Sequence, residues 1–291
     1  MNYILTGHKG LIGEYLKKRL DNDNWKCIRH IDEREGFNIL NLKSLKLNLE
    51  TQPVDIFIHA ASFCKINKCI ENPELCHLNN SDGVFECLEF CRKNNIKKFV
   101  FFSSSRVLSK EKNPYTASKM YGELLCEAYR QCYGIDYIII RPSTVYGPCH
   151  DLTSRLITTW VITALSDIPL ILYGNEKTKT LDFTHVDDFV DAIMLLLNKW
   201  EETKNNDYNI SGEEETLLMD LVGMIQEELT IKDLIRPIFI DVKNSEIAQP
   251  QQVKVDISKI KKLGFKPKIK LRDGVKQLVN FYLTEGKEWI K

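Results

Sequence analysis

The sequence lacks three features that would point to particular classes of protein: an excess of charge, a long apolar run and an ordered set of cysteines. Lys and Arg together number 40, and so do Asp and Glu, so the formal net charge of the 291 residues is zero. This balance gives no reason to expect non-specific binding to nucleic acid or to an anionic membrane. No apolar run approaches the roughly 20 residues that a membrane-spanning helix needs, and the first residues lack the pattern of a signal peptide. We therefore expect a cytoplasmic protein with no nucleic-acid or membrane partner.

The nine cysteines form no recognisable framework. Their number is odd, and no two of them are spaced as a CxxC pair. In a reducing compartment such residues serve as small apolar side chains. We expect no metal site, because no histidine follows them at the spacing of a metal-ligand set.

Strand and helix signals alternate in the first half of the chain. Apolar runs typical of strands lie at 2–6, 26–31, 54–59, 98–102 and 136–141, and helical patterns lie at 11–20, 74–94 and 115–133. Two of the runs, Phe99–Phe102 and Tyr137–Ile140, are continuously apolar, as parallel strands buried on both faces are. The pattern predicts an α/β protein with a doubly wound parallel sheet, the Rossmann fold.

The rhythm changes after Pro148. Helices are expected at 152–166, 186–199, 216–229, 258–263 and 271–283, strands at 168–173 and 238–242, and a polar linker at 201–207. We therefore expect a Rossmann domain over 1–147 and a smaller α/β substrate lobe over 148–291.

Three glycines follow the first expected strand and open the first helix, namely Gly7, Gly10 and Gly13. Glycine permits the tight turn and lets the backbone approach a pyrophosphate, which then lies at the helix N-terminus. Asp32, at the end of the second strand, is placed to accept hydrogen bonds from a ribose hydroxyl and to repel a 2′-phosphate. Lys9 and Arg34 could instead neutralise such a phosphate. The spacing predicts a dinucleotide site that favours NAD, with NADP as the alternative.

A second group of polar residues is suited to proton transfer. Tyr115 and Lys119 are four residues apart, so they share one face of an expected helix. An ammonium group near a phenol stabilises the phenolate and lowers its pKa from about 10, which makes the tyrosine a usable acid or base near neutral pH. The neighbouring strand ends in Ser103, Ser104 and Ser105, and a serine hydroxyl there could bind the same substrate oxygen.

Together these motifs resemble those of the extended short-chain dehydrogenase/reductases, in the group of nucleotide-sugar epimerases and dehydratases. The shared motifs, in chain order, are TGHKGLIG at 6–13, DIFIHAA at 55–61, Asn80 with Gly83, FFSSS at 101–105, YTASK at 115–119, RPSTVYGP at 141–148, THVDD at 184–188 and LGFKP at 263–267. They extend over nearly the whole chain. The resemblance implies interleaved lobes, in which 183–200 returns to the Rossmann domain, and a homodimer through the helices around 74–94 and 115–133.

The resemblance also implies roles for individual residues. Tyr115 would transfer the proton, Lys119 would lower its pKa and bind the nicotinamide ribose, and Ser104 would be the catalytic serine, with its two neighbours as close rivals. The residues expected to bind the cofactor are Gly7, Gly10, Leu11, Ile12, Gly13, Asp32, Asn38, Ile39, Ala60, Ala61, Ser62, Asn80, Ser103, Tyr115, Lys119 and Pro142. Those expected near the substrate are Ser105, Thr144 and His150.

Two departures from the family pattern bear on the reaction. Ser105-Arg106 stands where the 4,6-dehydratases have an Asp-Glu pair, so dehydration would lack its proton-transferring groups. Leu181 replaces an arginine that commonly binds the nucleotide diphosphate. We therefore expect an NAD(P)-dependent enzyme acting on a nucleotide-activated sugar, of the 4-epimerase or 4-ketoreductase type. The alternatives are a nucleotide-sugar 4,6-dehydratase, a reductase of a carbonyl substrate that carries no nucleotide, and a non-catalytic dinucleotide sensor.

Overall fold

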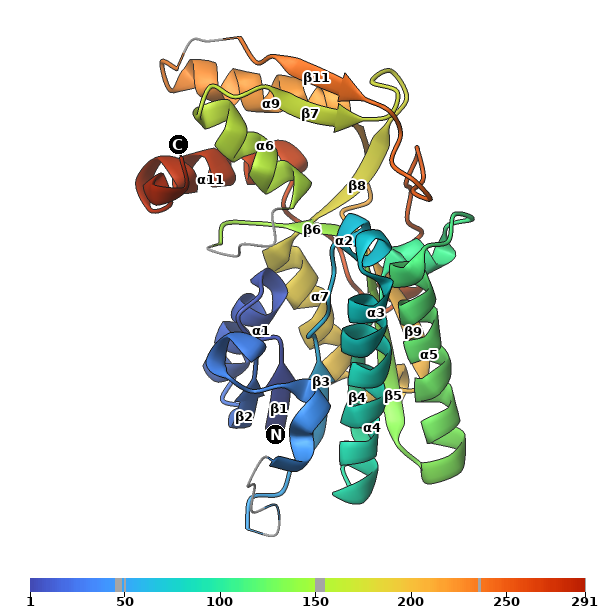
Figure 1. Cartoon of the computed structure of the whole chain (residues 1–291). Coiled ribbons are helices and arrows are strands. Elements are labelled where there is room, and N and C mark those ends of the chain that lie inside the picture. The colour runs from blue at the N-terminus through green and yellow to red at the C-terminus, as the bar shows by residue number, and fades with distance from the viewer. Residues whose placement is uncertain (45–48, 50, 150–154, 235–236, 291) are drawn as a thin grey trace. The chain divides into compact units, whose positions relative to one another are not determined.

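The computed structural model describes residues 1–44, 49, 51–149, 155–234 and 237–290 of the chain (Figure 1). The chain divides into two compact units. Unit 1 comprises Met1–Pro142 and Val190–Asn209, and unit 2 comprises Ser143–Phe189 and Ile210–Lys291. Each unit has a hydrophobic core of its own. Within the described ranges, no helix has the length and apolar character that crossing a membrane requires.

Unit 1 is built on a six-stranded sheet. Its strands are β1 (Asn2–Thr6), β2 (Lys26–Ile31), β3 (Ile56–His59), β4 (Lys98–Phe102), β5 (Asp136–Pro142) and β9 (Asn206–Ile210). They lie in the order β2-β1-β3-β4-β5-β9, and the first five pair in parallel (Figure 1). The strands β3 to β5 are buried along most of their length, which explains their continuous apolar runs. The structure confirms the doubly wound parallel sheet that the sequence predicts.

The helices of unit 1 follow the predicted alternation, but the short helices at 66–71 and 200–203 were not predicted, and the one expected over 74–94 is divided. They are α1 (Leu11–Asn22), α2 (Ile66–Glu71), α3 (Pro73–Cys76), α4 (Gly83–Lys93), α5 (Pro114–Tyr133), α7 (Val186–Asn198, in unit 1 from Val190) and α8 (Trp200–Thr203), with 3-10 turns at Glu33–Glu35, Ile39–Ser44 and Ser105–Leu108. Instead of one helix over 74–94, a π-helical turn at His77–Asp82 separates α3 from α4. Asn80 in that turn bonds both backbone groups of Phe63, at 2.8 and 3.1 Å, so the wider turn serves a contact outside the helix.

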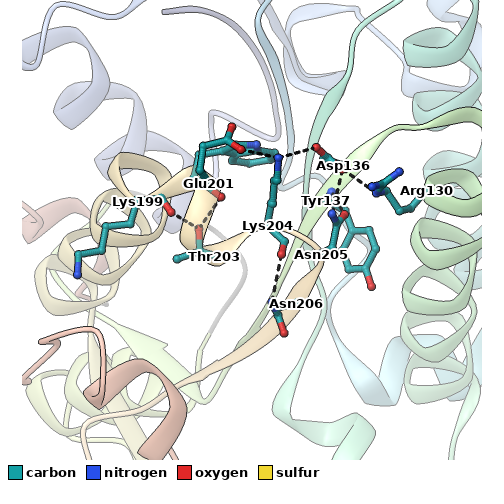
Figure 2. Close-up of polar contacts among 10 residues, drawn as sticks. Arg130, Asp136, Tyr137, Lys199, Glu201, Thr203, Lys204, Asn205 and Asn206 are labelled. Carbon is teal, nitrogen blue, oxygen red and sulfur yellow. Dashed lines mark hydrogen bonds and ion pairs between the residues drawn. The ribbon is translucent and has the colours of Figure 1, made fainter.

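The expectation of a linker at 201–207 is wrong. The segment forms α8 and the start of β9, which adds the sixth strand to the sheet. Figure 2 shows the polar contacts that hold it: Asp136 at the start of β5 accepts from Lys204 Nζ at 3.4 Å and from Asn205 Nδ2 at 2.9 Å. Asn205 also bonds both backbone groups of Tyr137. Residues 201–207 are therefore polar because they lie at the edge of the sheet, where charged side chains remain partly solvated.

In the part of unit 2 that the structure describes there are two small sheets and four helices. The strands β6 (Thr144–Tyr146), β8 (Thr180–His185) and β10 (Glu215–Leu217) form one sheet, and β7 (Leu170–Tyr173) pairs in parallel with β11 (Ile240–Lys243). The helices are α6 (Leu156–Leu165), α9 (Leu218–Ile231), α10 (Ser258–Lys261) and α11 (Leu271–Thr284), and a 3-10 turn follows at Lys287–Trp289. Their apolar faces pack around a core that includes Tyr146, Trp160 and Phe183.

Candidate active site

The glycine-rich turn between β1 and α1 requires glycine at two of its positions. Gly7 has a positive φ of 74°, and a Cβ there would lie 2.7 Å from the backbone nitrogen of Ala61. A Cβ on Gly13 would lie 2.1 Å from the carbonyl oxygen of Gly7. Gly10 is the N-cap of α1 and supplies no side-chain cap to the first turn of the helix. This geometry suits an anionic group held by backbone N–H donors, as a dinucleotide pyrophosphate is.

The end of β2 carries a carboxylate that is buried and already well bonded. Asp32 accepts from the backbone of Lys9 at 3.0 Å, from the backbone of Arg34 at 3.1 Å and from Arg34 Nε at 3.0 Å. Burial alone would raise the pKa of Asp32, but the hydrogen bonds from Arg34 and Lys9 hold it below the ordinary value. Lys9 Nζ pairs with Glu35 at 2.9 Å. Both cations that could neutralise a 2′-phosphate are therefore paired with carboxylates.

The N-terminal part of α5 brings the tyrosine and the lysine together. Asn113 caps the helix by accepting from the backbone of Thr116 at 3.0 Å, which starts the helix so that Tyr115 and Lys119 share its inner face. Lys119 Nζ lies 5.8 Å from the centre of the Tyr115 ring and donates to the carbonyl oxygen of Phe102 at 2.8 Å. Burial lowers the pKa of Lys119 to about 8. The ammonium group is thus held between the end of β4 and the phenol.

The three serines at the end of β4 differ in what their hydroxyl groups already bind. Ser103 donates to the carboxylate of Glu123 at 2.5 Å. Ser104 Oγ accepts from the backbone of Arg106 at 3.2 Å, which leaves its hydroxyl hydrogen available to a substrate oxygen. Ser105 begins the following 3-10 turn and, like Ser104, is buried. The bond to Glu123 therefore sets Ser103 apart, and Ser104 and Ser105 both stay candidate donors to a substrate.

The loop after β3 is fixed by two side chains that hold its backbone. Thr6 Oγ1 accepts from the backbone of Ala61 at 3.0 Å, and Ala60 donates its N–H to the carbonyl of Thr6 at 3.3 Å. Asn80 is buried, and its amide bonds Ser62, the backbone of Phe63 and Ser118. Sequence reasoning placed Asn80 at the cofactor. The structure shows that its amide already holds the loop that carries Ser62.

The remaining predicted residues lie in several places. Asn38 accepts from the backbone of Leu40 at 2.8 Å, and Ile39 is buried against Gly83. Leu11 is buried, Ile12 is half-buried, and Pro142 ends β5 in unit 1. Thr144 belongs to β6 in unit 2. His150 lies outside the described residues.

One residue of the site was missed by sequence reasoning. Glu123 joins Ser103 to Arg141, whose Nε donates to it at 2.8 Å. Its spacing of four residues after Lys119, which itself lies four after Tyr115, could have indicated that it shares their helix face.

Comparison with known proteins decides the family. The model of the NAD dependent epimerase/dehydratase family matches residues 3–211. The chain belongs to this family. As a member of the NAD-dependent epimerase/dehydratase family it is an enzyme, and its cofactor is NAD. The glycine turn and the buried Asp32 described above fit that cofactor, and the resemblance stated from the motifs is confirmed.

Individual relatives cover the chain from end to end. A UDP-glucuronate 4-epimerase from Thermodesulfobacterium geofontis is 27% identical over 329 residues, covering 99% of this chain and 98% of that protein. The structure of UDP-glucose 4-epimerase with UDP-glucose from Thermotoga maritima has a TM-score of 0.88 at 21% identity, covering 98% of this chain and 99% of that one. DesIV from Streptomyces venezuelae, a dTDP-glucose 4,6-dehydratase with NAD bound, has a TM-score of 0.86 at 22% identity, with coverage of 100% and 99%. An epimerase and a dehydratase thus have the same fold as this chain, so the fold alone does not select the reaction.

Proposed function

We propose that this chain is a nucleotide-sugar 4-epimerase or 4-ketoreductase in which Ser104, Tyr115 and Lys119 carry out proton transfer at the sugar C4 oxygen. The observation that supports it most is the arrangement at the start of α5, where the buried ammonium of Lys119 lies beside the Tyr115 ring and is held by the Phe102 carbonyl. The relatives named as sugar 4-epimerases support the choice of a nucleotide sugar as substrate.

The mechanism follows from what each side chain can do. NAD held by the glycine-rich turn and Asp32 would supply a hydride acceptor and donor for the sugar carbon. Tyr115 accepts the hydroxyl proton as the carbon is oxidised and gives it back when the carbon is reduced. The positive charge of Lys119 stabilises the phenolate of Tyr115, and the low polarity of its burial site strengthens that effect. Ser104 donates a hydrogen bond to the reacting oxygen and so fixes its position.

The choice of NAD over NADP rests on the acidic cluster at the end of β2. Asp32 is buried and keeps its negative charge. It pairs with Arg34, and Glu35 pairs with Lys9, so both cations near a 2′-phosphate are already bound to carboxylates. A ribose 2′-hydroxyl can instead donate to Asp32.

Dehydration is disfavoured by the residues that follow Ser104. Elimination of water needs a proton donor and acceptor near the sugar, and here Ser105 and Arg106 follow in the chain. A guanidinium stays protonated throughout the pH range of proteins, and a serine hydroxyl is a poor acid or base without a partner that activates it. This supports epimerisation or reduction over elimination.

One observation keeps a second candidate, a reductase of a carbonyl substrate that carries no nucleotide. Leu181, where many relatives would hold a phosphate with arginine, is buried in the core of unit 2. Lys179, two residues earlier, is also buried, and its ammonium donates to the carbonyl of Pro250 at 2.7 Å. A diphosphate would have to be held by other donors. Thr144 remains a proposed substrate contact.

We also propose that the enzyme forms a homodimer through unit 1. Apolar side chains that are between 39% and 64% exposed gather on the helical segments 73–93 and on α5, namely Leu75, Leu78, Phe85, Met120, Tyr121 and Leu124. Exposed apolar surface of this kind favours an interface. Leu124→Lys should convert a dimer into a monomer in light scattering. Ile231→Lys, on an exposed apolar position of α9 in unit 2, should leave the mass unchanged. A wild-type protein that is monomeric at micromolar concentration would refute the interface.

The decisive experiment combines cofactor content with a substrate panel. The purified protein is denatured, and the released dinucleotide is identified by mass spectrometry. NAD carried through purification is expected of an epimerase, which recycles the cofactor in place. UDP-glucose, UDP-glucuronate and a simple aldehyde would then be tested with the wild type and with Tyr115→Phe. We expect turnover of a UDP-sugar by the wild type, loss of turnover in the variant and retained NAD binding. Activity on the aldehyde alone would favour the second candidate, and an active Tyr115→Phe variant would refute the mechanism.

A further inference from the structure

A buried carboxylate joins the catalytic helix to the end of β4. Glu123 lies on the face of α5 that carries Tyr115 and Lys119, and its side chain is only 11% exposed. Its carboxylate accepts from Ser103 Oγ at 2.5 Å, from Arg141 Nε at 2.8 Å and from Arg141 Nη2 at 2.5 Å. These three bonds connect α5 to β4 and β5.

The same arginine extends the network to β9. Arg141 Nη1 donates to Asp207 at 2.8 Å, so the guanidinium bridges two carboxylates. The hydrogen bonds that Arg141 donates to Glu123, together with the charges of both carboxylates, raise the pKa of Arg141 above its usual value. Buried ion pairs of this kind add little net stability, because desolvation offsets the attraction, but they fix geometry through directed bonds. Glu123 therefore contributes more through the geometry that it fixes than through added stability.

The geometry that Glu123 fixes is that of the proposed catalytic groups. Ser103, which it holds, is flanked in the chain by Phe102 and Ser104. The Phe102 carbonyl holds the ammonium of Lys119 at 2.8 Å. Consecutive residues at the end of β4 are thus attached to consecutive turns of α5, one through Lys119 and one through Glu123.

We propose that Glu123 is a positioning residue: by holding Ser103 it sets where the Phe102 carbonyl keeps the Lys119 ammonium and where Ser104 presents its hydroxyl. This inference rests on the proposed function, because these positions matter only if Lys119 and Ser104 act in the reaction.

Glu123 also acts on Lys119 through its charge. Burial lowers the pKa of Lys119 to about 8, and the negative charge of Glu123 is one of the groups that counteract this lowering. Removing that charge lowers the pKa further, so the ammonium form is lost at a lower pH. A residue with a purely structural role would not move this titration.

The first test is Glu123→Gln, assayed with the UDP-sugar that the panel identifies. We expect kcat to fall by roughly ten- to a hundredfold, the loss that small displacements in an active site cause, while KM and the Kd for NAD stay within about threefold. The basic limb of the pH profile should move to lower pH. Glu127→Gln is the matched control, because Glu127 is exposed and lies one turn further along α5, and because its charge acts on Arg141 but is not named among the groups that act on Lys119. It should leave kcat and the pH profile unchanged.

A second variant separates the positioning effect of Glu123 from the effect of its charge. It also remains informative if Glu123→Gln fails to fold. Ser103→Ala removes only the hydroxyl and keeps the Glu123–Arg141 pair. We expect a lower kcat with the basic limb unmoved. A Ser103→Ala enzyme with wild-type kcat would overturn the inference, as would a folded Glu123→Gln enzyme with wild-type kcat and pH profile. If Tyr115→Phe also retains turnover, the proposed function fails instead.

Discussion

Replacing Lys119 with methionine should abolish turnover without destabilising the protein. Lys119 is buried, and burial holds its pKa at about 8, against 10.5 for a lysine free of the fold. Keeping the ammonium charged inside the folded protein therefore costs about 3 kcal/mol near neutral pH, at about 1.4 kcal/mol per pKa unit. Methionine has nearly the same shape and removes this cost.

The substitution also removes a favourable bond. The Phe102 carbonyl loses the donor that now lies at 2.8 Å, and leaving a buried acceptor without that donor costs about 1–3 kcal/mol. Subtracting this from the gain leaves Lys119→Met between about 0 and 2 kcal/mol more stable than the wild type at neutral pH. Lys119 would then be essential for turnover and yet lower the stability of the folded protein.

The pH dependence provides a sharper test than the stability at one pH. The unfolded chain keeps the proton of this lysine up to about pH 10.5, whereas the folded chain releases it near pH 8. Between these values the unfolded state binds more protons, so the stability of the wild type rises with pH relative to that of the variant. From about pH 7 to about pH 9.5 the relative gain should be about 2 kcal/mol.

Urea unfolding of NAD-free wild type and Lys119→Met at both pH values would measure this difference. The wild type should approach or overtake the variant at the higher pH. Equal pH dependence in the two proteins would show that Lys119 is not desolvated in the folded state, and a variant less stable by more than about 1 kcal/mol at neutral pH would refute the balance given above.

Two further predictions concern the cofactor. Gly13→Ala places a methyl group 2.1 Å from the Gly7 carbonyl oxygen, so it should lower NAD affinity at least about tenfold in calorimetry. A methyl group on Gly223 would meet open space among the described residues, so Gly223→Ala should bind NAD as the wild type does. Asp32→Asn removes the buried charge that faces a ribose hydroxyl, so the preference for NAD over NADP should fall by about tenfold or more, with exposed Glu33→Gln as the control. Unchanged cofactor preference in Asp32→Asn would contradict the proposed role of Asp32.

The parts of the fold that could be predicted from the sequence are those that depend on local sequence patterns. The glycine turn, the apolar runs of β4 and β5 and the helix that carries Tyr115 and Lys119 depend on residues within a few positions of one another. The strands β6, β8, β9 and β10 were missed because polar residues leave no apolar run of more than two residues in any of them. The π-helical turn was missed for a similar reason, since it depends on the bonds between Asn80 and Phe63.

The serines show why a site is harder to derive than a fold. In the sequence, Ser103, Ser104 and Ser105 are three identical side chains in a row, and only a resemblance ranks them. The structure sets Ser103 apart by what its hydroxyl already binds, a carboxylate 20 residues later in the chain. That carboxylate is in turn fixed by Arg141 on another strand. The proposed role of Ser104 therefore depends on a network whose members are scattered over the sequence, and substitutions in that network test the assignment more directly than substitution of the serine itself.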